Sequence, residues 1–313
     1  MPMSGCPVDS PTQVWIESSM QWFIDQFGAR QLRRDVVTPT ARFLPSDYRA
    51  SAEQIEEMVL AACLRMEVER QFIDLRLFDG SKEKQEAARS GKKRTVGHFR
   101  MAGGKAVVSL DLSETADPVL LLAILVHELC HVRLLAEKRI KADRPDNERL
   151  TDLLTVFFGY GILSTNAAMR FDRRSGAWIV PQGEFDDRSL NAARNDGYNR
   201  LGYLKSAEFG YALSCYAWLR REQSPSWERY VTPGPLVTMR QGLSYLKAAG
   251  ALGELPFQRL ASKPVKVGNV SLRLTSGQQG LPQFGLGLPR ASGQSQYPDP
   301  QNRPHGPTPP ARI

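Results

Sequence analysis

One apolar stretch constrains the fold of this chain more than any other. Residues 119–126 read Val-Leu-Leu-Leu-Ala-Ile-Leu-Val, and the motif His-Glu-Leu-Cys-His follows at 127–131. Neither Gly nor Pro interrupts residues 119–140, so the sequence predicts one continuous and largely buried helix over that range. Positions four apart share one face of a helix, so His127 and His131 can point at one common site in the protein interior.

The two histidines have the spacing of metal ligands. A pair of imidazoles on one helix face can hold zinc, and Glu128 lies close enough to hold a water molecule beside the ion. Hydrogen-bonded core histidines are the alternative, because so short a pattern also arises by chance. The chain has only four histidines, however, and finding two of them at this spacing around a glutamate favours a metal site. Cys130 is predicted to be a buried filler, since its position faces away from His127.

A second helix is predicted to supply a third ligand, which a zinc site with one open position needs. The segment begins with Pro145 and Asp146, which suit a first helical turn, and it carries an apolar stripe. Glu148 and Asp152 lie four residues apart and therefore share a face. We expect Glu148 to reach the ion and Asp152 to accept the second ring N–H of a ligating histidine.

At these residues the sequence resembles the gluzincin zinc metallopeptidases. Their pattern is His-Glu-x-x-His on one helix and Glu-x-x-x-Asp on the next, and here it reads His-Glu-Leu-Cys-His at 127–131 and Glu-Arg-Leu-Thr-Asp at 148–152. The resemblance covers roughly residues 105–160. It implies a zincin-like core, one zinc ion per chain and hydrolysis of an amide bond in a peptide or protein substrate.

The resemblance also implies a role for each matching residue. The implied zinc ligands are His127, His131 and Glu148. Glu128 becomes the general base, and Asp152 orients a ligating histidine.

A zinc-bearing scaffold that binds a partner without turnover is the alternative function. The intact Glu128 favours an enzyme, because a scaffold has no need of a base beside the metal. A hydrolase also needs a donor for the developing oxyanion, usually a Tyr or a His. Tyr203, Tyr211 and Tyr160 are the candidates, and for each of them a structural role is the alternative.

A β-hairpin is predicted just before the motif helix. Two strand-like runs, 96–100 and 105–110, flank an Ala-Gly-Gly turn. Metallopeptidases of the resembled group place a strand at the edge of a small sheet above the zinc, where an extended peptide pairs with it. Residues 107–110 are our candidate for that edge, and an ordinary interior strand is the alternative. His98 is a rival metal ligand, although it has no partner at ligand spacing.

The predicted fold class is α+β and mostly helical, with a small sheet beside the motif helix. Residues 1–95 are predicted to form an N-terminal α/β part, and 96–261 the zincin-like core with the helices that follow. Residues 262–274 are predicted to form a closing hairpin, and 275–313, rich in Pro, Gly and Gln, a disordered tail. Helices are expected at 10–27, 51–66, 119–140, 146–169, 206–221 and 236–249, and further strands at 35–39, 71–78 and 176–181.

The composition indicates which partners and which cellular compartment to expect. The net charge is +8, but no Lys/Arg cluster is interleaved with aromatic residues, so we expect no nucleic-acid partner. The four cysteines have no paired spacing, which favours reduced thiols. The N-terminus lacks a basic region followed by an apolar one, and the run at 119–126 is shorter than a membrane span. We therefore expect a cytoplasmic protein without a membrane span. No pattern indicates an oligomeric state.

Overall fold

The structure is a computed structural model that describes residues 5–81, 97–169 and 204–251. The chain divides into two compact units, Met1–Pro264 and Val265–Ile313, and every described residue belongs to the first. Helices dominate the described residues and three strands form one small sheet, so the predicted α+β, mostly helical class is confirmed. The hairpin predicted at 262–274, the tail at 275–313 and the strand at 176–181 lie outside the described residues.

Two N-terminal helices have the predicted bounds. α1 (Ser10–Phe27) ends at Gly28, and its N-cap is Asp9, whose carboxylate accepts the N–H of Thr12. α2 (Ala52–Met66) begins after Ser51, whose hydroxyl oxygen accepts the N–H of Gln54. Short 3₁₀ helices lie at Ala29–Arg33, Arg70–Phe72, Leu112–Glu114 and Ser226–Tyr230.

The prediction of a strand at 35–39 is wrong. These residues have no regular secondary structure and join no described sheet. The N–H of Val37 instead donates to the carbonyl of Gly159 at 2.9 Å. This short apolar run before a proline is therefore a connection that is hydrogen-bonded to a later turn of the chain.

The sheet has the order β1-β3-β2. β1 (Ile73–Phe78) pairs with β3 (Lys105–Asp111) in parallel, and β2 (Gly97–Ala102) pairs with β3 in the antiparallel direction. The predicted hairpin is therefore confirmed, and both glycines of its turn have positive φ values, 56° and 76°. The expectation that 107–110 forms an edge is wrong, because β3 is hydrogen-bonded to a strand on each side. Among the described residues, β1 and β2 are the outer strands.

The motif helix α4 (Pro118–His131) is the central helix of the fold. Asp117 caps it, and the helix continues only through one π-helical turn at Val132–Ala136, so it ends before the predicted residue 140. Pro118–Ala136 is long and apolar enough to span a membrane by length and composition alone, yet 78% of its apolar window is buried inside the fold. This burial is that of a core helix and is compatible with a soluble protein.

The second motif lies on α5 (Asn147–Phe157), which is followed by α6 (Gly161–Ala168). A single helix over 146–169 is thus wrong, because the chain turns at Gly159, whose φ is 84°. This positive φ favours glycine, and a Cβ there would also displace the ends of the Arg65 and Tyr216 side chains, 2.8 Å and 2.9 Å away.

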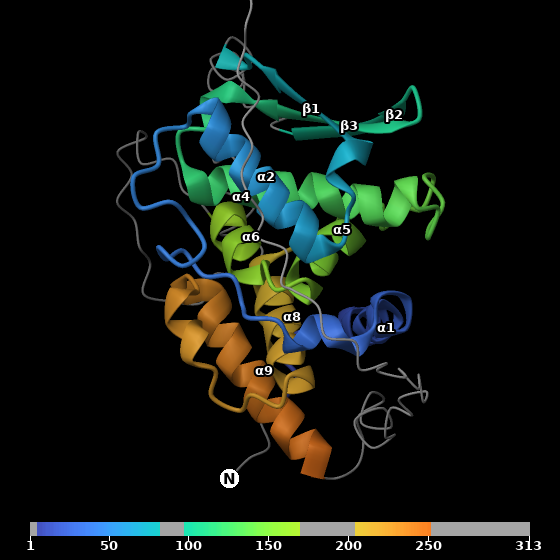
Figure 1. The fold of residues 1–313 in the computed structure, drawn as a ribbon. Coiled ribbons are helices and arrows are strands. Elements are labelled where there is room, and N and C mark those ends of the chain that lie inside the picture. Colours follow the sequence, from blue (N-terminus) through green and yellow to red (C-terminus); the bar gives the residue numbers. More distant parts are fainter. Residues whose placement is uncertain (1–4, 82–96, 170–203, 252–313) are drawn as a thin grey trace, which may run out of the picture. The chain divides into compact units, whose positions relative to one another are not determined.

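The remaining helices form a layer beyond α5 and α6. These are α8 (Ser206–Leu219) and α9 (Pro233–Ala251), which pack on each other, and α1, which packs on α5 and α8. Figure 1 shows the sheet on one side of α2 and α4, with the later helices on the other side. The rings of Phe23 and Phe157, 5.5 Å apart, help to fix α1 on α5. The helix that carries the second motif is therefore held from several directions.

Candidate metal centre

α4 and α5 bring the two motifs together at one point. His127 Nε2 lies 3.3 Å from Glu148 Oε2, and His131 Nε2 lies 3.4 Å from the same oxygen. All three atoms lie within 4.8 Å of one another. Two donors bound at roughly 2.0–2.1 Å to a tetrahedral zinc ion are about 3.3–3.4 Å apart. Both histidine–carboxylate distances therefore have the spacing that tetrahedral zinc requires.

The second nitrogen of each imidazole also has a partner. His127 Nδ1 lies 2.9 Å from Asp152 Oδ1, the arrangement expected for Asp152. His131 Nδ1 lies 3.4 Å from the hydroxyl of Thr151, which itself donates to the carbonyl of Asn147 at 2.9 Å. Since that hydroxyl uses its hydrogen elsewhere, its oxygen can accept an imidazole N–H. Both rings can then carry their proton on Nδ1 and present the Nε2 lone pair to a metal ion.

The charges of the site favour a bound cation. Burial lowers the pKa of His127, but Asp152 and Glu148 outweigh it and raise that pKa to about 10. Burial raises the pKa of Glu148, whereas the two imidazoles hold it well below its usual range. Without a metal, the carboxylates therefore keep a positive charge on His127. A divalent cation between the same groups would replace that proton.

Glu128 lies beside the ligand group without belonging to it. Glu128 is only 5% exposed. Burial raises the pKa of its carboxyl group, and the charges of His127 and His131 lower that pKa in part. Strand β2 lies directly against it: a Cβ added to Gly97 would be 2.6 Å from Glu128 Oε1. The absence of a side chain at Gly97 thus lets the backbone of β2 approach the carboxylate.

Strand β2 contributes a second residue to the centre. The ring of Phe99 stacks on His131, with centroids 6.0 Å apart and an interplanar angle of 16°. Alternation along a strand puts Gly97 and Phe99 on one face and His98 on the other. His98 is accordingly exposed and is not in the ligand group, so it does not compete with the two motif histidines.

Two of the three candidate tyrosines lie in the described residues, and each contacts a side chain other than the two histidines. The Tyr211 hydroxyl donates to Glu17 Oε1 at 2.5 Å, so its partner is on α1 and not at the histidines. Tyr160 is buried with the guanidinium of Arg65 5.5 Å from its ring centroid. Tyr203 lies outside the described residues. Cys130 is buried, as expected, and burial raises the pKa of its thiol well above the usual value.

Thr151, Gly97 and Phe99 are residues that the sequence analysis missed. Thr151 precedes Asp152 on the metal-facing turn of α5, so its position next to a motif residue is the one available signal. Gly97 and Phe99 share one face of a predicted hairpin strand, but no sequence pattern near them indicates that this face packs against α4.

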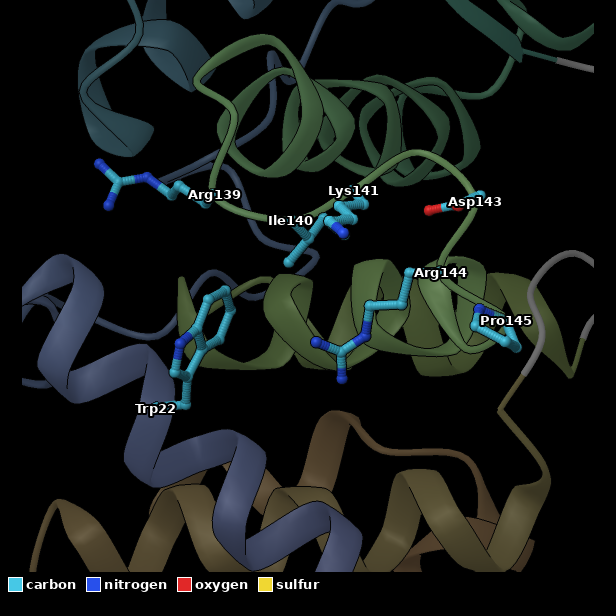
Figure 2. Close-up of a pocket in the computed structure, with 7 residues that line it drawn as sticks. All are labelled: Trp22, Arg139, Ile140, Lys141, Asp143, Arg144 and Pro145. Carbon is cyan, nitrogen blue, oxygen red and sulfur yellow. The ribbon is translucent and has the colours of Figure 1, made fainter.

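A separate cavity of about 490 Å³ lies beside the connection between α4 and α5. Figure 2 shows Trp22 on one side of it and Arg139, Lys141 and Arg144 along the connecting loop. Its two arginines already have carboxylate partners, Glu137 at 2.8 Å and Asp146 at 2.9 Å. None of the metal-centre residues lines this cavity.

Comparison with known proteins finds no match to the chain among protein-family models, curated proteins or solved structures.

Proposed function

We propose that this protein is a zinc-dependent hydrolase that cleaves a peptide or related amide bond. One observation carries the proposal: His127 Nε2, His131 Nε2 and Glu148 Oε2 converge at zinc-ligand spacing with Glu128 beside them. Two imidazoles and a carboxylate are donors that suit zinc. Three protein ligands leave one position open, which is typical of catalytic sites and not of structural ones.

The chemistry divides between the ion and the chain. A bound zinc ion would polarise the scissile carbonyl and lower the pKa of a coordinated water towards about 7. Glu128 accepts a proton from the attacking water on its carboxylate and later delivers it to the leaving amine. The raised pKa of this buried carboxyl suits a group that must both take up and release a proton.

The outer strand β2 is the place where an extended substrate fits best. Among the described residues, β2 has one neighbour, β3, so its other edge can pair with a peptide backbone. Because residue 97 is a glycine, the backbone of β2 can approach the Glu128 carboxylate closely. A peptide bond held along β2 would thus lie close to the proposed base.

Three variants test the division of roles. Glu128→Gln keeps the size of the side chain and removes the base, so it should retain about one zinc per chain and lose roughly 10²–10⁴-fold in rate. Glu148→Gln weakens a ligand and should lose zinc and activity together. His131→Ala should lose the metal. Zinc content is measured by elemental analysis, and turnover with a substrate selected from a peptide library.

The same experiment separates an enzyme from a zinc scaffold. If Glu128→Gln cleaves as fast as the wild type, the assignment of the base is wrong. A zinc scaffold explains the result better if the wild type holds zinc, cleaves no library peptide, and binds its partner with the same affinity as the Glu128→Gln variant does.

A further inference from the structure

The segment that leads into α8 contacts Asp152, a residue of the metal centre. The N–H of Leu204 donates to Asp152 Oδ2 at 3.0 Å, in a buried hydrogen bond. The other oxygen of the same carboxylate, Oδ1, lies 2.9 Å from His127 Nδ1. Asp152 is only 2% exposed. One buried carboxylate thus joins the start of α8 to a ligand of the proposed metal site.

A second contact lies one turn away on the same two helices. Glu208, in the first turn of α8, accepts the N–H of Lys205 through Oε2 at 2.8 Å. Its Oε1 accepts from Arg149 Nη2 at 2.9 Å, and Arg149 also lies over the ring of Trp15, with Cζ 4.4 Å from the centroid. The side chain of Glu208 is 8% exposed and is held between its own helix cap and α5.

We infer that residues 204–208 are a positioning element of the metal centre, acting through the Leu204 N–H and the Glu208 carboxylate. The two attachment points on α5, Arg149 and Asp152, are three residues apart; Arg149 directly follows the proposed ligand Glu148, and Asp152 directly follows Thr151. A rotation of α5 would move Glu148 and Asp152 together, because they lie four residues apart on one face of the helix. Two contacts with α8 restrict this rotation. The inference rests on the proposed zinc site.

Positioning and simple packing predict different results. If the contact only joins α8 to α5, its loss lowers the stability of the metal-free and zinc-bound proteins equally, so zinc affinity stays unchanged. A contact that positions ligands stabilises the zinc-bound protein more, so its loss lowers zinc affinity. By the same reciprocity, zinc must tighten the start of α8.

The first measurement is zinc affinity of the full chain by competition with a chelator. Glu208→Gln and Arg149→Met, which retains an aliphatic stem over Trp15, should each weaken zinc binding roughly threefold to tenfold. This is less than the 10–100-fold typical of a direct partner of a ligating histidine. The double variant should weaken binding no more than the stronger single one, because both remove one contact. Arg149→Lys, which keeps the charge, should recover part of the affinity.

A matched control breaks an ion pair away from the metal centre. Glu228→Gln removes the partner of Arg240, 2.8 Å away, and should leave zinc affinity at the wild-type value. Hydrogen exchange gives a second readout: zinc should slow exchange at the Leu204 amide in the wild type, and less so in Glu208→Gln.

The outcomes separate this inference from the proposed function. Wild-type zinc affinity in both Glu208→Gln and Arg149→Met, with lower melting temperatures, would show packing only and overturn this inference alone. An unchanged Leu204 amide on zinc addition would do the same. Absence of zinc binding in the wild type overturns the proposed function, and this inference with it.

Discussion

Single atoms decide whether the ligands of the centre are held in the correct orientation. His131 Nδ1 faces the Thr151 hydroxyl at 3.4 Å, so Thr151 has for one histidine the role that Asp152 has for the other. Thr151→Val keeps the shape and removes the acceptor, and should lower zinc affinity about tenfold, the lower end of such effects. Thr151→Ser should bind zinc nearly as the wild type does. Competition with a chelator measures the zinc affinity of each variant. Equal zinc affinities of Thr151→Val and the wild type would contradict this role of Thr151.

Acid should weaken the attachment of the start of α5 through Asp146. Its carboxylate pairs with Arg144 and accepts the indole N–H of Trp15 at 2.7 Å, and these contacts lower its pKa from 3.8 to about 2. A pKa that is lower in the folded protein adds stability above the unfolded value, and this contribution is lost as pH falls from about 4 to about 2. Urea unfolding of Asp146→Asn should show a loss of stability at pH 7 that shrinks over this range. A difference that grows on acidification would contradict this assignment.

A residue of the site could be predicted where the sequence pattern that indicates it is local. His127, His131, Glu148 and Asp152 could be located because helical periodicity places each pair on one face. Thr151 and Leu204 could not, because their roles depend on how α5 packs against α4 and α8. Local patterns also do not distinguish among the candidate oxyanion tyrosines, because the contacts of Tyr160 and Tyr211 depend on distant helices.

Strand β2 is the element that brings the backbone closest to the proposed base. Because a Cβ at Gly97 would lie 2.6 Å from Glu128 Oε1 and equally close to Ile124, Gly97→Ala must displace the carboxylate or the strand. We expect zinc content to be retained and turnover to fall by about 10²-fold, as for other small displacements of a reacting group. Gly5→Ala, outside the sheet and with nothing within 4 Å of the added Cβ, is the control and should keep its turnover. Equal turnover of both variants would contradict the placement of β2.

Helix ends and strand order show where prediction from the sequence stops. α1 and α2 could be delimited because caps and glycine act locally. The hairpin could also be predicted, but the parallel pairing of β1 with β3 could not, and this pairing makes β3 the central strand. The break at Gly159 was missed because glycine inside an apolar pattern does not reveal a positive φ.

For the molecule as a whole, the apolar helix α4 connects the fold to the proposed chemistry. It is buried between the sheet and the later helices (Figure 1), and it carries two of the three donors at its C-terminal end. Burial of the metal-facing groups raises the energetic cost of charge there, so the histidines, Glu148 and Asp152 must compensate one another. A bound cation would complete this compensation, as the proposed zinc site requires.

X-ray absorption at the zinc edge of the purified protein tests the proposed zinc site directly. We predict one zinc per chain with only nitrogen and oxygen neighbours at roughly 2.0–2.1 Å and the outer scattering of two imidazoles. His131→Ala should lose the signal of one imidazole or the metal itself. A sulfur neighbour at about 2.3 Å, or a spectrum unchanged by His131→Ala, would place the ion elsewhere and contradict the proposed ligands.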